Sequence, residues 1–206
     1  CNLKCPYCHS KDLVYLKENM YPIVTEKINE FLESHRKDLD GIYISGGEPL
    51  MHEGVVSFLQ YAKTLNYKIK IHTNGMFYER LKTILAQKLV DHVRKKKKNA
   101  PSAYAKTCGV EDMDLKDIEK SLDLLKQSVV PYDICVTLVD ELHNQETIEE
   151  LGEWLQGVDT VILQPFEDSK TTIDHSLHRP SFEVVLKYKN IFEKYVKHVK
   201  IRGDQA

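Results

Sequence analysis

Long apolar runs are missing from this 206-residue sequence: no stretch of about 18 apolar residues is present, and no secretory signal pattern is visible. We therefore expect no membrane partner. Basic and acidic residues nearly balance, at 29 and 31, so the chain lacks the strongly basic character that is typical of nucleic-acid-binding domains. Cysteines are few and odd in number, five in all, with three of them clustered. This usage argues against a secreted disulfide framework and predicts a reducing cytoplasm.

The periodicity of the apolar residues predicts alternating strands and helices. Extended apolar segments predict strands at residues 41–45, 68–72, 89–93, 134–139, 160–163 and 199–202. Helical spacing of apolar residues occupies four of the intervening segments, at residues 55–65, 115–125, 148–155 and 185–195. Asp114, Asn144 and Ser181 stand where the N-caps of the last three helices are expected.

This alternation predicts an α/β fold built from right-handed βαβ units around a parallel sheet. Six strands are too few for a closed eight-stranded barrel, so we expect a partial, open TIM-like (β/α)6 barrel in a single domain over residues 1–206. A chain of this length, with 42% hydrophobic residues, can bury roughly 70% of its unfolded surface. Ligands of such folds bind at the carboxyl ends of the strands.

Three cysteines open the sequence in a C-x3-C-x2-C arrangement, as Cys1, Cys5 and Cys8. This spacing is typical of a loop that binds three irons of a four-iron cluster and leaves the fourth iron open to a ligand. Thiols and imidazole at short spacing also suit a structural zinc ion, with His9 as a further ligand. Closed zinc sites usually add a distant pair of ligands, and no such pair is evident in the sequence. The spacing alone thus leaves two interpretations of this loop, an iron–sulfur cluster and a zinc ion.

Motifs rich in glycine and polar residues follow three of the predicted strands. The two glycines of Gly46-Gly47-Glu48 let the backbone approach a ligand closely, and Glu48 can accept hydrogen bonds from neighbouring backbone. Thr73-Asn74-Gly75 follows the second strand, and Gln164-Pro165-Phe166 closes the fifth. The same residues would also suit tight turns or the polar end of a buried strand. If they form a site, all of them lie on one rim of the sheet.

Taken together, these motifs resemble the radical S-adenosylmethionine (SAM) superfamily, and within it the glycyl-radical-enzyme activases of the anaerobic ribonucleotide reductase type. The resemblance rests on Cys-Asn-Leu-Lys-Cys-Pro-Tyr-Cys-His, Ile-Ser-Gly-Gly-Glu-Pro, His-Thr-Asn-Gly, Val-Asp-His-Val, Asn-Ala-Pro, Leu-Gln-Pro-Phe and the closing Ile-Arg-Gly, between Cys1 and Gly203. It implies a [4Fe-4S] cluster on Cys1, Cys5 and Cys8. It also implies a SAM site made of Tyr7, Gly46, Gly47, Glu48, Thr73, Asn74, Lys98 and Gln164. Because relatives carry a strand before the cysteine loop, we expect one before Cys1.

The resemblance also implies a function. The cluster would reduce SAM, and the resulting 5'-deoxyadenosyl radical would remove a hydrogen atom from a glycine of a partner enzyme. The implied partners are a glycyl radical enzyme and a low-potential electron donor such as flavodoxin or ferredoxin. Two alternatives remain. One is a radical SAM enzyme that modifies a small molecule, a peptide or RNA, because fold does not fix substrate. The other is a non-catalytic zinc-binding module.

Two positions depart from the pattern of the family. Relatives carry aspartates at the positions of His72 and Lys96, and some use them to bind a monovalent cation beside the SAM carboxylate. A potential cation and a fixed cation would repel such an ion, so we expect the Lys96 ammonium to replace it. The basic run Arg94–Lys98 could instead be a solvated strand end or a strip for RNA. We expect the remaining cysteines and two loop histidines to have no role in the site: Cys108, Cys135, His175 and His178.

Overall fold

The computed structural model describes residues 1–16 and 21–203. Its centre is a six-stranded, entirely parallel sheet in which the spatial order of the strands follows their order in the sequence. The strands are β1 (Gly41–Ile44), β2 (Lys68–Thr73), β3 (His92–Lys97), β4 (Tyr132–Leu138), β5 (Thr160–Pro165) and β6 (His198–Ile201). The predicted α/β fold with an open parallel sheet is confirmed. The structure does not test the strand expected before Cys1.

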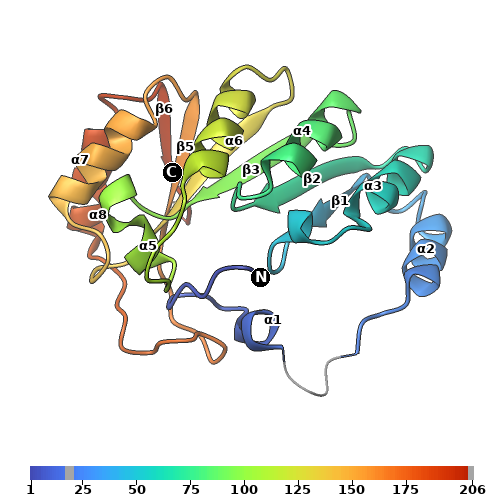
Figure 1. Ribbon diagram of the computed structural model, residues 1–206, viewed down its shortest axis with the longest axis horizontal. Helices are drawn as coiled ribbons and strands as arrows, with labels where there is room; N and C mark the ends of the chain where they lie inside the picture. The colour runs from blue at the N-terminus through green and yellow to red at the C-terminus, as the bar shows by residue number, and fades with distance from the viewer. Residues whose placement is uncertain (17–20, 204–206) are drawn as a thin grey trace.

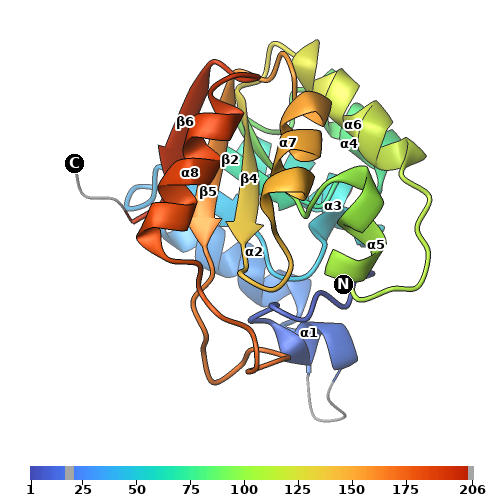
Figure 2. The same cartoon turned by 90° about the vertical axis from the view of Figure 1, so that its left-hand side faces the viewer.

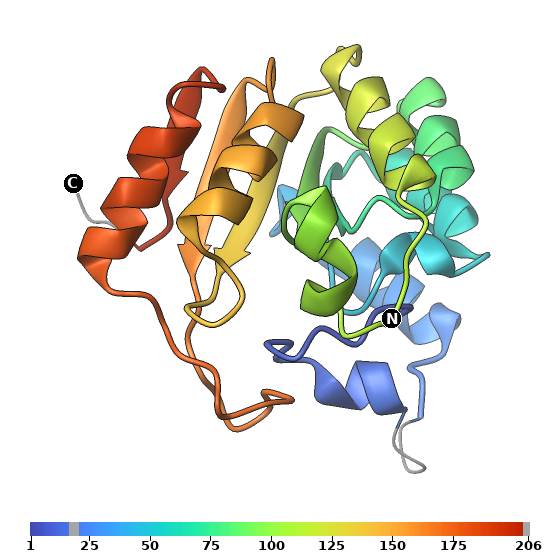
Figure 3. The ribbon, with the colours of Figure 1, turned by 60° about the vertical axis from the view of Figure 1, so that its left-hand side comes forward.

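Helices connect the strands and cover one face of the sheet (Figures 1 and 3). The covering helices are α3 (Val55–Thr64), α4 (Tyr78–Ala86), α6 (Lys116–Lys126), α7 (Gln145–Trp154) and α8 (Phe182–Phe192). Shorter or peripheral helices are α1 (Lys11–Tyr15), α2 (Thr25–Ser34), α5 (Tyr104–Thr107) and the 3₁₀ turns η1 (Pro49–Met51) and η2 (Pro101–Ala103). We call the opposite, helix-free face of the sheet the inner face. None of the helices within the described residues is long and apolar enough to cross a membrane.

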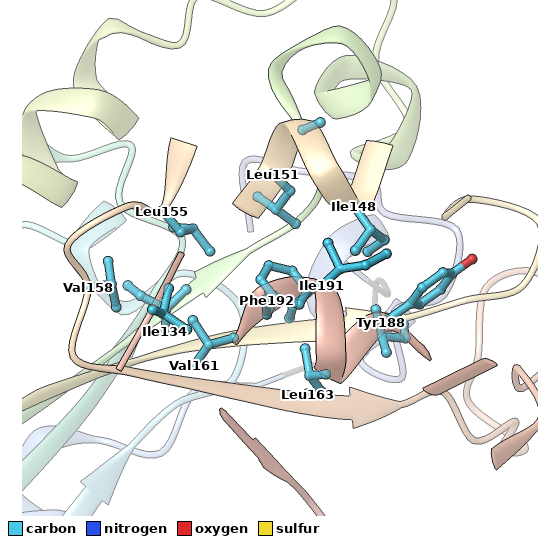
Figure 4. Close-up of a cluster of buried hydrophobic side chains, with 14 of the residues drawn as sticks. Ile134, Ile148, Leu151, Leu155, Val158, Val161, Leu163, Tyr188, Ile191 and Phe192 are labelled. Carbon is cyan, nitrogen blue, oxygen red and sulfur yellow. The ribbon is translucent and has the colours of Figure 1, made fainter. Parts of the chain in front are cut away.

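The apolar residues that predicted the elements pack between the sheet and these helices. One cluster joins β4 and β5 to α7 and α8, and includes Ile134, Val161, Leu151 and Phe192 (Figure 4). A second cluster lies under α3 and α4. A third packs Leu3, Cys5 and Tyr7 against Tyr104 and Phe166, beneath the cysteine loop. Because all three clusters hold the elements in register, the strand ends are fixed relative to the cysteine loop.

The prediction of the third strand at residues 89–93 is wrong: β3 spans His92–Lys97. Leu89 and Val90 are buried in the core beneath α4, so their apolar character reflects packing in the turn before the strand. The strand itself contains the basic run, in which Lys95 and Lys97 are fully buried. The interpretation of this run as a solvated strand end is therefore wrong as well. Its side chains alternate between the two faces of the sheet, so they form no continuous basic strip for RNA.

Two of the three expected N-caps are confirmed. Asn144 caps α7 in a reciprocal arrangement with Thr147, and the Ser181 hydroxyl accepts a hydrogen bond from the backbone amide of Val184 in α8. The prediction for α6 is wrong, because the helix begins at Lys116 after Leu115. Asp114 lies one residue too early to be the N-cap, although its carboxylate accepts a hydrogen bond from the Lys116 amide at 2.9 Å.

The carboxyl ends of the strands point toward the cysteine loop and α1, as the arrowheads of β4 and β5 show in Figure 2. The long connection between β5 and α8 passes beside this loop. Backbone hydrogen bonds join the two segments, from Ile173 to Cys8 and from Asp174 to Pro6. The cysteine loop and the connection between β5 and α8 thus meet at the carboxyl ends of the strands.

Candidate active site

A cavity of about 270 Å³ lies at the carboxyl ends of the strands. It is bordered by the cysteine loop, by the ends of β1, β2 and β3, and by residues of β4 and β5. All eleven residues predicted to bind a metal or cofactor line it: Cys1, Cys5, Tyr7, Cys8, Gly46, Gly47, Glu48, Thr73, Asn74, Lys98 and Gln164. The fold therefore brings together residues that are as much as 163 positions apart in the sequence, Cys1 and Gln164.

The cysteine loop is fixed to the protein on two sides. The backbone amide of Lys4 donates to the Cys108 carbonyl at 3.0 Å, and Ile173 and Asp174 donate to the Cys8 and Pro6 carbonyls at 3.1 and 2.9 Å. A further bond within the loop joins the Cys8 amide to the Cys5 carbonyl. Cys5 is buried, whereas Cys1 and Cys8 are partly exposed. Backbone hydrogen bonds thus fix the loop at Lys4, Pro6 and Cys8.

Cys108, which we expected to have no role in the site, lies against Cys5. Its thiol donates a hydrogen bond to the Cys5 sulfur, and this bond, together with the nearby Lys98 ammonium, lowers the pKa of Cys5 although burial opposes the shift. The same hydrogen bond and burial raise the pKa of Cys108. The pairing thus favours the thiolate of Cys5, the form that binds metals.

The three thiols of the cysteine loop open onto the same cavity. Among the described residues, no three cysteine, histidine, aspartate or glutamate side chains are already grouped closely enough to hold one metal ion. Three thiolates around one cavity are the donor set that a four-iron cluster with one open iron takes.

Glu48 connects the ends of β1 and β2. It is 2% exposed, and its carboxylate accepts hydrogen bonds from the amide of Leu50 at 3.0 Å, the hydroxyl of Thr73 at 2.8 Å and the amide of Asn74 at 2.6 Å. Burial raises the pKa of Glu48, and these three donors partly offset that effect. The expectation that Glu48 accepts hydrogen bonds from neighbouring backbone is confirmed.

Thr73 and Asn74 use most of their polar groups within the protein. The Thr73 hydroxyl also accepts from the Gly75 amide at 3.0 Å, and the Asn74 side-chain amide donates to the side-chain oxygen of Asn2 at 2.8 Å. These two residues therefore shape the rim and tie it to the cysteine loop. Asn2 was not singled out from the sequence, because only the fold places it beside Asn74.

The two glycines after β1 are needed for different reasons. Gly46 has a φ of +122°, in the region that favours glycine. Gly47 has no such conformation, but a Cβ atom there would lie 3.0 Å from the Cys1 nitrogen and 3.3 Å from its Cα and Cβ. Gly47 is thus required by the close approach of the cysteine loop.

Two lysines of the basic run, Lys96 and Lys98, point into the cavity. Burial would lower the pKa of Lys98, but the Cys5 and Cys108 sulfurs raise it above its usual value, and its ammonium lies 5.6 Å from the centre of the Tyr7 ring. Burial, and then the charge of Lys98, lower the pKa of Lys96. Among the described residues neither lysine pairs with a carboxylate, which favours an anion in this cavity.

His72 is not the cation that the sequence suggested. Burial, followed by the charges of Lys96 and Arg94, lowers the pKa of His72 to about 3, so the ring is neutral at physiological pH. Its Nδ1 is hydrogen-bonded to the Tyr43 hydroxyl, and its buried Nε2 has no partner among residues 1–16 and 21–203. Because His72 lines the cavity, Nε2 is available to a ligand there. Tyr43, which orients the ring, was missed by the sequence reasoning.

The other lysines of β3 face the helices. Lys97 packs against the rings of Trp154 and Tyr104, and burial lowers its pKa to about 4. Burial likewise lowers the pKa of Lys95 to about 7. Cys135 is buried in β4, as expected. The two loop histidines pair with carboxylates on the surface and do not line the cavity: His175 with Asp168 and His178 with Glu141.

Comparison with known proteins gives consistent results. Residues 1–156 match the family model described as the radical SAM superfamily. A protein of Methanocaldococcus jannaschii named "Putative glycyl-radical enzyme activating enzyme MJ1227" is 31% identical over 208 residues, which cover 98% of this chain and 85% of the relative. A domain of pyruvate-formate lyase-activating enzyme from Bacteroides vulgatus has a TM-score of 0.62 at 19% identity, covering 79% of this chain and 99% of that one. Streptococcus suis SuiB bound to S-adenosylmethionine has a TM-score of 0.74 at 15% identity, covering 98% of this chain and 48% of that one.

Proposed function

The chain belongs to the radical SAM superfamily, and we propose that it is an activating enzyme that installs a glycyl radical on a partner protein, for example an anaerobic ribonucleotide reductase. When bound, a [4Fe-4S] cluster and SAM supply one electron and the 5'-deoxyadenosyl radical that abstracts hydrogen from glycine. The observation that carries the proposal is that three thiols, the glycines after β1 and two lysines all line one cavity. The relative from Methanocaldococcus jannaschii supports the choice of a protein substrate.

Cys1, Cys5 and Cys8 would hold the cluster. The Cys108 thiol and the Lys98 ammonium lower the pKa of Cys5 and so favour its thiolate. A hydrogen bond from Cys108 to a ligand sulfur would also influence the reduction potential of the cluster. Three protein ligands would leave one iron of the cluster open to the methionine end of SAM.

The rim of the cavity would hold SAM. The backbone at Gly46 and Gly47 would approach the methionine end, Glu48 would fix this segment against β2, and Tyr7 and Gln164 would border the adenosine. Thr73 and Asn74 would keep the rim in place. Lys96 or Lys98 would pair with the SAM carboxylate. The whole domain over residues 1–206 would contribute to this single site.

The protein would also have to exclude water from the reacting centre. Leu3, Phe166 and Leu177 pack around the cysteine loop and are buried, so they keep solvent away from the reacting centre on that side. We place the enzyme in the cytoplasm with a low-potential electron donor such as flavodoxin or ferredoxin, because its five free thiols require a reducing environment.

The test begins with anaerobic reconstitution with iron and sulfide. The wild type should take up about four irons per chain and convert SAM to 5'-deoxyadenosine when reduced. Serine at Cys1, Cys5 or Cys8 should abolish both, whereas Cys135→Ser, at a buried cysteine outside the cavity, should retain both.

The partner is tested by electron paramagnetic resonance. A candidate glycyl radical enzyme encoded beside this protein should acquire the doublet signal of a glycyl radical when it is mixed with the reduced enzyme and SAM. Formation of 5'-deoxyadenosine with no such signal on any candidate, but with a modified small molecule or RNA, would replace the protein substrate by the alternative. Uptake of zinc with failure of iron reconstitution would contradict the proposed function as a whole.

A further inference from the structure

Two buried cysteines from distant parts of the sequence contact each other behind the cavity. Cys108 directly follows α5, which lies beside the cysteine loop (Figures 2 and 3). It is fully buried, Cys5 is 4% exposed, and the Cys108 thiol donates a hydrogen bond to the Cys5 sulfur. A cluster on the three cysteines of the loop gives Cys108 no place among its ligands. The position of this fourth thiol therefore calls for another explanation.

The backbone holds the two cysteines together. The amide of Lys4, the residue before Cys5, donates to the Cys108 carbonyl at 3.0 Å. The residue after Cys108 is Gly109, which has a φ of +68°, and a Cβ atom there would lie 2.3 Å from the Lys4 carbonyl oxygen. Only glycine permits so close an approach. Because the sulfurs already contact each other and the backbones are tied beside them, a disulfide between Cys5 and Cys108 needs little movement of the chain.

Only one cysteine of this pair faces the cavity. Cys5 lines it, whereas Cys108 lies behind Cys5 and outside the residues that form the cavity wall. A small oxidant that enters the cavity thus meets Cys5 first. This order is typical of redox-sensitive pairs, in which a reachable thiol is oxidised and a neighbouring thiol then closes the disulfide. The Lys98 ammonium beside Cys5 favours the thiolate, which is the form that reacts.

The other cysteines have neighbours of a different kind. The Cys8 sulfur accepts a hydrogen bond from the Ser10 amide at 3.4 Å, and the Cys135 thiol donates to the side-chain oxygen of Gln164 at 3.8 Å. Cys1 and Cys8 are partly exposed. The thiol that lies against Cys5 is thus that of Cys108.

We propose that Cys5 and Cys108 form a reversible disulfide when hydrogen peroxide destroys the cluster, and that this disulfide preserves Cys5 for later rebuilding. The Cys5 thiolate attacks one peroxide oxygen, the O–O bond breaks, and a sulfenic acid forms with release of hydroxide. The Cys108 sulfur then attacks the Cys5 sulfur. The S–S bond forms, the S–O bond breaks, and the oxygen leaves as water with the proton of the Cys108 thiol. The two sulfurs together lose the two electrons that the peroxide gains.

The disulfide protects the site because it stops oxidation at a reversible stage. A disulfide returns to two thiols by exchange with a thiol reductant such as dithiothreitol. A sulfinic acid on Cys5 is not reduced by thiols and would remove a ligand permanently. The inference deepens the proposed function, since Cys5 is one of the three residues proposed to hold the cluster.

The test exposes the cluster-loaded enzyme to hydrogen peroxide, blocks the remaining thiols with iodoacetamide and maps the cysteines by mass spectrometry without reduction. Trypsin cleaves after lysine, so the proposed disulfide links residues 5–11 to residues 107–116. Fragmentation of the first peptide distinguishes Cys5 from Cys8. The wild type should give this linked pair as its main oxidised product, and dithiothreitol followed by iron and sulfide should restore most of its iron.

The first variant, Cys108→Ser, removes the thiol that closes the disulfide. Its Cys5 should be recovered mainly as sulfinic or sulfonic acid, and most of its capacity to take up iron should be lost after the same treatment. The matched control is Cys135→Ser, at a cysteine that is also buried but lies outside the cavity. The control should give the linked peptides and recover its iron like the wild type.

The second variant keeps both thiols and moves them apart. Gly109→Ala places a methyl group 2.3 Å from the Lys4 carbonyl oxygen, so it should displace Cys108 from the loop and give little of the linked peptides. Gly157→Ala is its control, because Gly157 also has a positive φ, of +83°, but a methyl group there meets nothing within 4 Å. If Gly109→Ala does not fold, the comparison of Cys108→Ser with Cys135→Ser still decides the matter.

A disulfide within the cysteine loop as the main product of the wild type would overturn the inference. Equal recovery of iron by Cys108→Ser and the wild type would overturn it as well. Failure of the untreated wild type to take up a cluster is a separate result, which contradicts the proposed function. The disulfide is then mapped on the peroxide-treated chain alone, where its presence supports the redox role of the pair and its absence refutes it.

Discussion

The Asn74 backbone amide donates a hydrogen bond to the Glu48 carboxylate at 2.6 Å, although the two residues follow different strands and are 26 positions apart. Asn74 in turn donates through its side chain to Asn2, inside the cysteine loop. The end of β1, the end of β2 and the cysteine loop are thus joined in one polar network. A change at Glu48 is therefore transmitted to the loop that would hold the cluster.

Glu48→Gln should disrupt this network. The carboxylate faces three donors, and a glutamine would direct its NH₂ group at one of them. Leaving a buried donor unpaired costs about 1–3 kcal/mol, so the midpoint of urea unfolding should fall accordingly. SAM affinity, measured by equilibrium dialysis, should fall as well. Glu53→Gln, at an exposed position nearby, serves as the control. Unchanged stability in the Glu48 variant would contradict this role.

Gly47→Ala should weaken the cysteine loop. The new methyl group would lie 3.0 Å from the Cys1 nitrogen, closer than ordinary contacts, so Cys1 must move by a few tenths of an ångström. We expect a lower iron content after reconstitution and weaker SAM binding, and Gly47→Val should show both effects more strongly. Gly54→Ala, where a methyl group meets nothing within 4 Å, should reconstitute like the wild type. Full iron content in both Gly47 variants would show that the contact is tolerated.

His72 should make folding depend on pH. Its pKa is about 3 in the folded protein against 6.5 in the unfolded chain, so below pH 6.5 the unfolded state binds the proton and is stabilised. The neutral His72 ring therefore contributes fully to the free energy of unfolding above pH 6.5. This contribution is lost as the pH falls below 6.5. Between pH 7.5 and pH 5 the free energy of unfolding should therefore fall by about 1 kcal/mol. The full difference in pKa would give about 2 kcal/mol, which we reduce because the ring is incompletely buried.

The measurement is the free energy of urea unfolding at the two pH values, for the wild type, His72→Gln and His52→Gln. The difference between the two pH values should be smaller in His72→Gln than in the wild type. His52 is exposed, so its variant should keep the wild-type difference. Equal pH dependence in all three proteins would mean that His72 is not buried as a neutral ring.

Lys96 should replace a bound monovalent cation. Its ammonium lines the cavity without an ion-pair partner among the described residues, so it is placed to neutralise a carboxylate. Lys96→Met should weaken SAM binding about tenfold, as expected for loss of a partly buried charge-assisted bond. Lys187→Met, at an exposed position on α8, should leave SAM binding unchanged.

The same role predicts how alkali ions act. SAM cleavage by the wild type should be indifferent to an exchange of sodium for potassium at constant ionic strength. Lys96→Asp combined with His72→Asp restores two carboxylates and should create a dependence on these ions. A wild-type rate that rises with potassium would refute the replacement.

Much of the fold follows from local patterns. Apolar segments bounded by glycine and polar residues identified five of the six strands to within a few residues, because each of these strands carries its own apolar side chains. Asn144 and Ser181 were recognisable as N-caps because capping is a local interaction. The spacing of Cys1, Cys5 and Cys8 indicated a metal-binding loop for the same reason.

The remaining features depend on contacts between distant segments. β3 was misplaced because lysines normally avoid burial, whereas here the strand lies between two others and its Lys97 side chain packs against Trp154. The neutral state of His72 comes from burial and from charges on the neighbouring strand, and the contact of Cys108 with Cys5 spans about half the chain. The sequence by itself thus determined the α/β alternation and the cysteine spacing that predicts a cluster. Only the tertiary structure decided which charges are compensated and which remain free, because burial and electrostatic pairing depend on neighbours that no local pattern specifies.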